Sequence, residues 1–288
     1  MQLAILADDL SGAAETAAAL GTGAELFLWP EAPPPGTRIS ATDLDTRQLS
    51  PTQAATRLIT ALTTLDDTPD TPLIFKKIDS LLRGNVAAEV AALVADDTLV
   101  VLTPALPEQG RTVVDGVLFC DGTPLAQTDL WTLEATAPPA SVVAALGDVL
   151  IRNLTLDMVR SGCPGESLTR ALGGVASCDA ETQEDLTAIV DAGLRAAPRV
   201  RFAGSSALAR ALSSRLALTL LPGTDRVHSG SGGVLHVLGT GSPKAVAQAE
   251  HLAGRISLSH HVLSPTVLSH WAAHGPSWIF SASTTWKW

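Results

Sequence analysis

Short runs of aliphatic and β-branched residues alternate with longer alanine-rich stretches of helical periodicity along the first 228 residues. This alternation predicts βαβ units, in which helices join buried strands, around a mainly parallel sheet. The expected strands are Gln2–Ala7, Glu25–Leu28, Arg38–Ala41, Pro72–Lys76, Thr98–Leu102, Val175–Cys178 and Arg199–Phe202. The expected helices are Ala13–Leu20, Pro51–Leu65, Asn85–Val94, Ser141–Leu146, Ser167–Leu172, Glu181–Ala196 and Ser206–Ser214. We therefore predict an α/β fold with a mainly parallel sheet flanked by helices.

The composition of the chain changes near residue 228, inside a Gly/Ser-rich stretch (HSGSGG) that is typical of a linker. Residues 229–288 hold one acid and three bases, whereas the first 228 residues carry a net charge of −12. The second part is expected to open with a strand at Val234–Leu238 and a helix at Lys244–Leu252. The sequence thus predicts two domains, residues 1–228 and a smaller, partial α/β domain at residues 229–288.

The overall composition disfavours several classes of protein. The net charge of −10 argues against a nucleic-acid surface, because the phosphate backbone attracts clustered Lys and Arg. The apolar runs fall short of the ~20 residues that span a bilayer, and the N-terminus lacks the basic segment of a secretory signal. The three cysteines have no CxxC spacing, which argues against a zinc site or a disulfide framework. We therefore expect a cytoplasmic protein with a small-molecule partner, no membrane or nucleic-acid partner and no metal site of its own.

Two adjacent carboxylates, Asp8 and Asp9, follow the first expected strand and precede a turn of small residues that includes Ser11. Ligands of open α/β sheets bind outside the carboxyl ends of the strands, so a site is expected here. Helix capping by Asp9 or Ser11 is the simpler alternative, but one acid would suffice for it. Two neighbouring acids repel each other, which favours a functional role.

The segment Lys76–Asn85 (KKIDSLLRGN) follows another apolar strand and offers several polar groups within a few positions. Lys77 and Arg83 suit the binding of a carboxylate or a phosphate, and Arg83 can bind it through two hydrogen bonds. Asp79 and Ser80 lie between these two cations. A solvated loop with an exposed ion pair is the alternative interpretation.

Two further strand ends carry candidate residues. The loop Thr103–Gly116 is stiffened by prolines and presents Arg111 for anion recognition. A plain β-hairpin around Asp115 and the following glycine explains this loop equally well. The end of the third expected strand brings Asp43 and Arg47.

Gly/Ser-rich turns between a strand and a helix occur twice, once with Gly204 and Ser205 and once with Gly239 and Ser242. Backbone N–H groups in such turns can bind phosphate. Neither turn fits GxxxxGK[ST] or GxGxxG, so the spacing alone is a weak signal. The missing GxGxxG also disfavours a nicotinamide-dependent dehydrogenase on a doubly wound sheet.

Six segments resemble, in order, those of the four-carbon acid sugar kinases: ADDLSGAAETA, DLDTR, KKIDSLLRGN, PALPEQGR, DAET and AGSSALA. The resemblance spans about residues 1–250, and the KxDSxxRGN segment is specific to that family. It implies phosphorylation of a hydroxyl of threonate, erythronate or an oxo-tetronate by ATP with Mg²⁺. It also implies that the first domain binds the sugar acid and that the second binds the nucleotide, although this chain lacks the later SGGxTA-type segment of the family.

The resemblance implies roles for the residues described above. The catalytic candidates are Asp8, Asp9 and Asp79, one of which would accept the hydroxyl proton. The substrate-binding candidates are Ser11, Asp43, Arg47, Lys77, Ser80, Arg83 and Arg111. The nucleotide-side candidates are Gly204, Ser205, Gly239 and Ser242. A sugar-acid-binding module without a complete nucleotide domain stays open as an alternative, as does assembly into a homodimer.

Overall fold

The computed structural model describes residues 2–20, 23–34, 36–66, 71–132, 134–161, 168–197, 199–216 and 243–255. The chain divides into two units, Met1–Asp225 and Arg226–Trp288. In the second unit, helix α9 (Pro243–Arg255) confirms the helix expected there. The strand expected at Val234–Leu238 lies outside the described residues.

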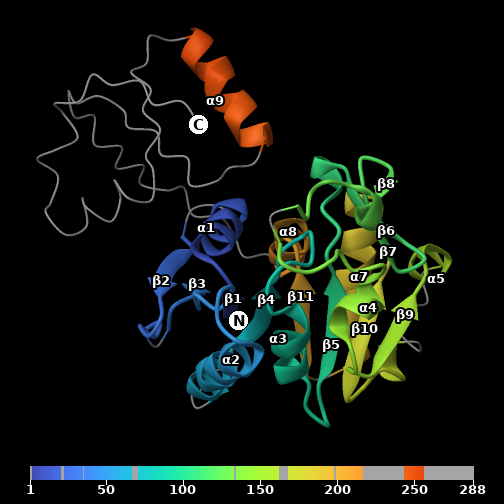
Figure 1. The fold of residues 1–288 in the computed structure, drawn as a ribbon. Helices are drawn as coiled ribbons and strands as arrows, with labels where there is room; N and C mark the ends of the chain where they lie inside the picture. Colours follow the sequence, from blue (N-terminus) through green and yellow to red (C-terminus); the bar gives the residue numbers. More distant parts are fainter. Residues whose placement is uncertain are drawn as a thin grey trace, which may run out of the picture. The chain divides into compact units, whose positions relative to one another are not determined.

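An eight-stranded sheet forms the centre of the first unit, in the order β2-β3-β1-β4-β11-β5-β10-β9 (Figure 1). All of its neighbouring strands are parallel. The strands are β1 (Leu3–Ala7), β2 (Glu25–Leu28), β3 (Ile39–Asp43), β4 (Leu73–Lys77), β5 (Leu99–Thr103), β9 (Ile151–Leu154), β10 (Gly174–Cys178) and β11 (Val200–Gly204). The predicted α/β fold with a mainly parallel sheet is therefore confirmed, including all seven strands expected before residue 228.

The direction of each crossover decides which face of the sheet its helix covers, because crossovers between parallel strands are right-handed. Connections that run toward the β2 edge contain α1 (Leu10–Ala19), α5 (Leu156–Arg160) and α7 (Gln183–Ala196). These helices form one packed layer with α8 (Ser206–Arg215). Connections that run toward the β9 edge contain α2 (Pro51–Asp66), α3 (Val86–Leu93) and α4 (Val142–Leu146), which pack together as the other layer. The result is a three-layer α/β/α arrangement.

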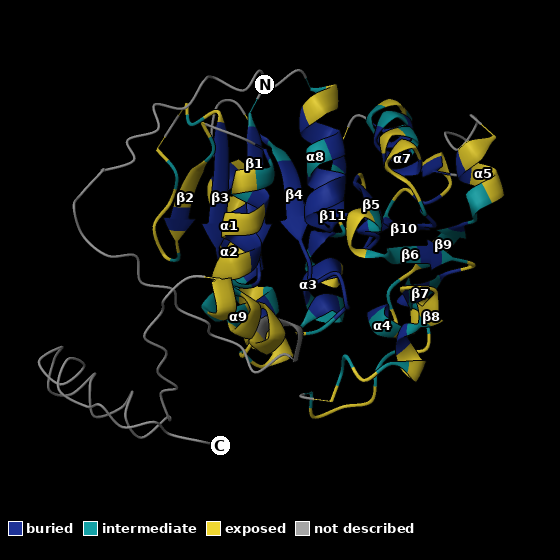
Figure 2. Ribbon diagram, turned by 90° about the horizontal axis from the view of Figure 1, so that it is seen from above, coloured by how far each residue is buried: buried dark blue, intermediate teal, exposed yellow. Residues whose placement is uncertain are grey.

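Both layers of helices bury the central strands, which appear dark blue in Figure 2. The strands β1, β3, β5 and β10 are buried at every position, as expected where helices cover both faces of a parallel sheet. Phe75 and Phe202 are among the largest fully buried side chains. The core thus fills the two faces of the sheet, and polar residues collect at the carboxyl ends of the strands.

Two elements of the central sheet and its helical layers were not predicted from the sequence. The edge strand β9 contains Arg152 and Asn153 and is only partly buried, so it lacks a continuous apolar run. Helix α5 has only five residues, too few to show a periodic pattern. The helix expected at Ser167–Leu172 starts outside the described residues, and of its described part, residues 168–172, Leu168 and Thr169 are helical.

A small antiparallel sheet follows β5 and contains β6 (Arg111–Val114), β7 (Val117–Cys120) and β8 (Thr123–Pro124). Asp115 and Gly116 form the turn between β6 and β7, with positive φ angles of 50° and 72° that suit a tight hairpin. Short 3₁₀ helices flank this sheet at Pro107–Gln109 and Leu125–Gln127. Across the described ranges, no helix has the length and apolar character needed to cross a membrane.

Candidate active site

The carboxyl ends of four neighbouring strands lie level with one another. Ala7 of β1 pairs in register with Asp43 of β3 and with Lys77 of β4, and Gly204 of β11 also pairs with Lys77. The loops that follow therefore leave the sheet from the same edge. The chain leaves β1 and β4 toward opposite faces, through α1 and α3, and such a divergence opens a crevice for ligands. Candidate residues from segments far apart in the sequence meet at this edge.

Arg47 joins carboxylates from two strand ends. Its Nε and Nη2 atoms lie 2.8 and 2.7 Å from Oδ2 of Asp8, and its Nη1 atom lies 2.7 Å from Oδ2 of Asp9. The same guanidinium lies 3.8 Å from Oδ1 of Asp79. The backbone N–H of Arg47 also donates to the carbonyl of Asp8 at 3.1 Å. One cation therefore offsets the repulsion among three carboxylates that the sequence placed in two separate motifs.

Arg83 binds Asp79 through two hydrogen bonds within the KKIDSLLRGN segment. Its Nε and Nη2 atoms donate to Oδ2 and Oδ1 of Asp79, each at 2.8 Å. The backbone N–H groups of Leu81 and Arg83 also donate to Oδ2 of Asp79, each at 3.2 Å. This is a partly buried, bidentate ion pair, and the alternative of an exposed ion pair on a solvated loop is wrong.

The pKa values of the clustered groups reflect these pairings. Burial alone would raise the pKa of Asp79, but the hydrogen bonds and charge of Arg83, together with the charge of Arg47, hold that pKa below its ordinary value. Burial would lower the pKa of Arg47, but Asp8, Asp79 and Asp9 raise it. Burial raises the pKa of Asp43, and the nearby acids add to that effect. Asp79 and the two arginines are therefore charged at neutral pH.

The three clustered acids differ in their access to solvent. The side chain of Asp9 is 28% exposed, whereas those of Asp8 and Asp79 are 3% and 9% exposed. Asp9 also accepts a hydrogen bond from the backbone N–H of Gly12 at 2.7 Å, so it caps α1 in addition to its contact with Arg47. The Oδ1 atom of Asp8 is buried and has no hydrogen-bond partner. A buried acceptor without a partner is uncommon and is typical of a functional site.

The turn between β4 and α3 packs directly against this cluster. Leu82 and Gly84 both have positive φ angles, 63° and 83°, so the chain bends sharply here. A Cβ atom on Gly84 would lie 3.4 Å from Cγ of Arg47 and 3.4 Å from Oδ2 of Asp8. The turn therefore forms one wall of the site, and a larger residue at position 84 would be strained.

Lys77 lies on the side of the sheet that α1 and α8 cover. Its Nζ donates to the carbonyl of Ile78 at 3.1 Å and lies 3.8 Å from Oε2 of Glu15. The hydroxyl of Ser206, in α8, donates to Oε1 of Glu15 at 2.7 Å. Sequence reasoning missed Glu15, because it lies within α1 and follows no strand directly. Ser206 belongs to the turn after β11, of which only Gly204 and Ser205 were chosen as candidates. The available signal was that Glu15 is the only charged residue of α1.

The remaining substrate-side candidates are placed as follows. Arg111 donates from Nη1 to the hydroxyl of Ser80, so the loop after β5 reaches the segment after β4. Arg111 is also the first residue of β6. The loop after β5 therefore forms the expected β-hairpin and also contacts the segment after β4. Asp43 is buried at the end of β3 and accepts from the backbone N–H of Asp45 at 2.7 Å. Ser11 is exposed in the first turn of α1.

The nucleotide-side candidates are engaged in packing or lie outside the described residues. A Cβ atom on Gly204 would lie 2.4 Å from the carbonyl oxygen of Thr103, so close packing requires glycine there. Ser205 is fully buried, and its hydroxyl donates to the carbonyl of Ala105. Gly239 and Ser242 lie outside the described residues. A role of these four candidates in nucleotide binding stays a prediction.

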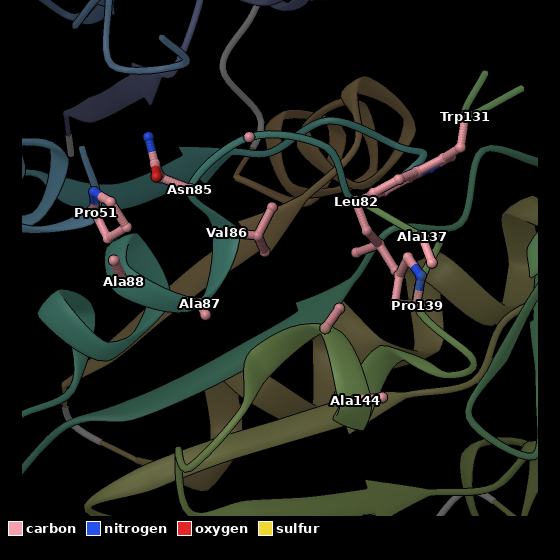
Figure 3. A pocket seen from close by; sticks show the side chains of 12 residues that line it. Pro51, Leu82, Asn85, Val86, Ala87, Ala88, Trp131, Ala137, Pro139 and Ala144 are labelled. Carbon is pink, nitrogen blue, oxygen red and sulfur yellow. The ribbon is translucent and has the colours of Figure 1, made fainter. Parts of the chain in front are cut away.

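A cavity of about 320 Å³ lies beside the first turn of α3 (Figure 3). Its lining is mostly apolar: Pro51, Leu82, Gly84, Asn85, Val86, Ala87, Ala88, Trp131, Ala137, Pro139, Ala144 and Ala145. A hydroxylated anion requires hydrogen-bonding partners, which this lining hardly supplies. The polar cluster around Arg47, rather than this cavity, is therefore the candidate active site.

Within the described part of the chain, no group of three or more His, Cys, Asp or Glu side chains is arranged to hold a metal ion. The clustered acids Asp8, Asp9 and Asp79 contact arginine side chains instead.

The chain is similar to a known family and to several known proteins. Residues 3–212 match the family described as "Sugar-binding N-terminal domain". A D-threonate kinase from Cupriavidus necator is 36% identical over 294 residues, which cover 95% of this chain and 69% of that protein. A D-threonate kinase from Salmonella typhimurium is 30% identical and aligns with 75% of this chain and 54% of its own length. A D-erythronate kinase from Heliobacterium modesticaldum is 33% identical and aligns with 64% of this chain and 46% of its own length. The chain thus spans between about half and two thirds of these relatives.

Solved structures share the fold. A crystal structure from Bordetella bronchiseptica, described as a domain of unknown function with bound citrate and as a domain-swapped dimer, is 25% identical. Its TM-score is 0.65, and the alignment covers 95% of this chain and 69% of that chain. A Haemophilus influenzae protein of 22% identity has a TM-score of 0.64 and covers 74% of this chain and 56% of its own.

Proposed function

Because the chain belongs to the sugar-binding N-terminal domain family of the four-carbon acid sugar kinases, we propose that it catalyses phosphoryl transfer from ATP to a four-carbon sugar acid. The acceptor is a hydroxyl of threonate, erythronate or an oxo-tetronate. D-Threonate is the first acid to test, since two of the relatives are D-threonate kinases.

One observation supports this proposal most directly: carboxylates and cations from three separate loops gather at one edge of the sheet. Asp8 and Asp9 come from the loop after β1, Arg47 from the loop after β3, and Asp79 and Arg83 from the loop after β4. A sugar acid carries one carboxylate and several hydroxyls. The cations suit the carboxylate, and the acids suit the hydroxyls, as hydrogen-bond acceptors.

Arg83 and Lys77 are the cations that we assign to the substrate carboxylate or the incoming phosphate. Arg83 uses Nε and Nη2 for Asp79, which leaves Nη1 for a ligand, and its side chain is 32% exposed. Lys77 is almost buried, with its side chain 6% exposed, beside the N-terminal part of α1. Two cations at different depths would hold the anion in one orientation and bring the acceptor hydroxyl toward the acids.

Asp9 is the acid that we assign to the acceptor hydroxyl. It is the most exposed of the three, whereas Asp79 is clasped by Arg83 and its pKa lies below the ordinary value, which makes it a weak base. Asp9 would accept the proton of the hydroxyl as the oxygen attacks the phosphorus atom. The unpartnered Oδ1 of Asp8 would accept a hydrogen bond from a neighbouring hydroxyl, which would satisfy that buried oxygen.

ATP, bound as its magnesium complex, would supply the γ-phosphoryl group and leave as ADP, and the magnesium ion would supply part of the positive charge that stabilises the transfer. The residues described here account for the acceptor side of the reaction. Gly239 and Ser242 are retained as nucleotide-side candidates within residues 229–288 of the predicted second domain. We also propose that the protein forms a homodimer, since the Bordetella relative is described as a domain-swapped dimer. A cytoplasmic location stays a separate proposal.

A coupled ADP-release assay of the 288-residue chain with MgATP tests the proposal directly. The acceptors are D-threonate, D-erythronate and 3-oxo-tetronate, with five-carbon sugar acids as controls. We expect ADP release that depends on one of the four-carbon acids. If no acid stimulates ADP release although calorimetry shows that D-threonate binds, the chain is a binding module. If neither release nor binding occurs, the proposed substrate class is wrong.

A further inference from the structure

A buried charge pair lies next to the loop that carries Arg47. Lys76 and Glu89 have 0% and 1% of their side chains exposed, and Nζ of Lys76 lies 3.1 Å from Oε2 of Glu89. Side chains alternate along a strand, so Lys76 faces α3 while its neighbour Lys77 faces α1. Lys76 therefore takes no direct part in the proposed substrate site, although it belongs to the same motif.

The pair continues into the Arg47 loop through a hydroxyl group. Thr46, which is fully buried, donates from Oγ1 to Oε1 of Glu89 at 2.6 Å. The backbone N–H groups of Thr46 and Arg47 both donate to the carbonyl of Asp8, at 2.9 and 3.1 Å. The chain of contacts thus runs from Lys76 to Glu89, to Thr46 and to the backbone of Asp8.

Asn85 holds the same loop through a second set of hydrogen bonds. The side-chain amide of Asn85, which precedes α3, donates to the carbonyls of Thr46 and Leu49, each at 2.9 Å. Two residues at the start of α3 thus fix the loop from Thr46 to Leu49 on both sides of Arg47.

A buried ion pair is a costly way to fill space, because both charges lose their hydration and apolar residues of similar size often stabilise a fold as well. Such a pair does give a fixed geometry when each oxygen has its own partner, and here the two oxygens of Glu89 contact different groups. We propose that Lys76, Glu89 and Thr46, together with Asn85, are positioning residues that hold Arg47 against Asp8 and Asp9. The predicted effect of these residues on sugar-acid binding rests on the proposed function. Their predicted effect on the order of the loop does not.

The test variant is Thr46→Val, which removes the hydroxyl and keeps the shape of the side chain. Thr46→Ser is the matched rescue, because it restores a hydroxyl that can reach Glu89. Thr98→Val is the control for general loss of stability. Thr98 is buried just before β5, at the amino ends of the strands and away from the site. If Thr46→Val does not fold, Asn85→Asp takes its place. It replaces the side-chain amide that donates to the carbonyls of Thr46 and Leu49 with a carboxylate, which cannot donate.

Two measurements on the full chain distinguish positioning from stability alone. Hydrogen exchange followed by mass spectrometry should show faster exchange in the peptide that contains residues 44–49 for Thr46→Val, but not for Thr46→Ser or Thr98→Val. Calorimetry with D-threonate should show binding weakened by about 10- to 100-fold in Thr46→Val and restored in Thr46→Ser, as for the loss of one hydrogen bond to a charged group.

The outcomes separate this inference from the proposed function. Unchanged exchange in residues 44–49 together with unchanged binding would overturn the positioning role. Equal losses in Thr46→Val and Thr98→Val would also overturn it, because they would indicate stability alone. If wild-type protein binds no D-threonate but the exchange difference is found, the network stands and the proposed substrate fails.

Discussion

Two clusters of acids at the same edge of the sheet differ in the partners that they contact. Asp179, directly after β10, accepts hydrogen bonds from the backbone N–H groups of Asp115 and Gly116 at 2.6 and 3.0 Å. Asp8 and Asp9, directly after β1, contact the guanidinium of Arg47 instead. Both clusters follow parallel strands and look alike in sequence. The kind of partner, rather than the residue type, separates them.

The acids near β10 complete turns and helix ends. Asp185 accepts from the backbone N–H groups of Glu181 and Thr182, at 2.9 and 3.1 Å, as part of a capping box at the start of α7. Arg160 binds the same carboxylate with two nitrogens. Asp179 thus closes a turn through backbone N–H groups, and Asp185 has an arginine partner of its own. Arg47 differs because three carboxylates from two loops share one guanidinium.

The largest expected effect is that of Asp9→Asn on catalysis. Loss of the carboxylate that faces the acceptor hydroxyl should lower kcat/KM for the sugar acid by about 10²–10⁴-fold. The amide can still cap α1, so the fold should be retained. Steady-state kinetics with circular dichroism as the control measure both. A variant with a normal rate would remove Asp9 from the site.

A large effect of the opposite kind is expected for Asp179→Ala. The change removes a buried carboxylate that accepts hydrogen bonds from two backbone N–H groups and from the side chain of Asn153, and it should lower the free energy of unfolding by about 2–4 kcal/mol. The kcat/KM of the folded protein should stay within about twofold of the wild type, an estimate that follows from the absence of contact with the Arg47 cluster. Urea denaturation and kinetics on the same sample measure the two quantities. A fall in kcat/KM comparable with that of Asp9→Asn would abolish the distinction between the clusters.

Arg83→Lys should have an intermediate effect on the Arg47 cluster. Lysine keeps a positive charge for Asp79 but cannot bind it bidentately and also present a nitrogen to a ligand. We expect KM for the sugar acid to rise by about tenfold, as for the loss of one charged hydrogen bond, with a smaller change in kcat. An unchanged KM would show that Arg83 acts only on Asp79.

The smallest expected effect concerns how steeply the free energy of unfolding falls at acidic pH, to which Asp185 near β10 contributes. Hydrogen bonding to Arg160, with help from backbone N–H groups, holds the pKa of Asp185 below its ordinary value despite burial. An acid with a lowered pKa stabilises the fold above its unfolded pKa of about 4, and this contribution is lost as pH falls through the folded pKa. Arg160→Gln should therefore make stability fall less steeply below about pH 4, with unchanged sugar-acid binding. Urea midpoints across that range measure the slope, and an unaltered slope would contradict the assignment.

Much of the fold follows from local patterns in the sequence, and the site follows only in part. Continuous apolar runs identified the buried central strands, but the half-exposed β9 had no such run. Strand ends located Asp9, Arg47 and Arg83, because parallel strands bring their carboxyl ends to one edge. The choice of Lys77 over Lys76 followed from the family resemblance, because the face to which each side chain points depends on the place of β4 in the sheet.

Other partners could not be found from strand ends at all. Glu89 and Glu15 lie within helices, and their contacts with the two lysines depend on how α3 and α1 pack on opposite faces. Ser205 looked like part of a phosphate-binding turn, but its hydroxyl is engaged by Ala105 in the fold. Motifs of this kind identify the edge of the sheet that carries chemistry, while packing decides what each side chain contacts.

Calorimetric titration with D-threonate of the wild type, Arg83→Lys and Asp179→Ala tests most directly whether the loops around Arg47, and not the turn at Asp179, receive the sugar acid. The account predicts saturable binding to the wild type and to folded Asp179→Ala, and binding weakened by about tenfold to Arg83→Lys. Equal affinity in all three proteins, or weakening only in Asp179→Ala, would contradict it.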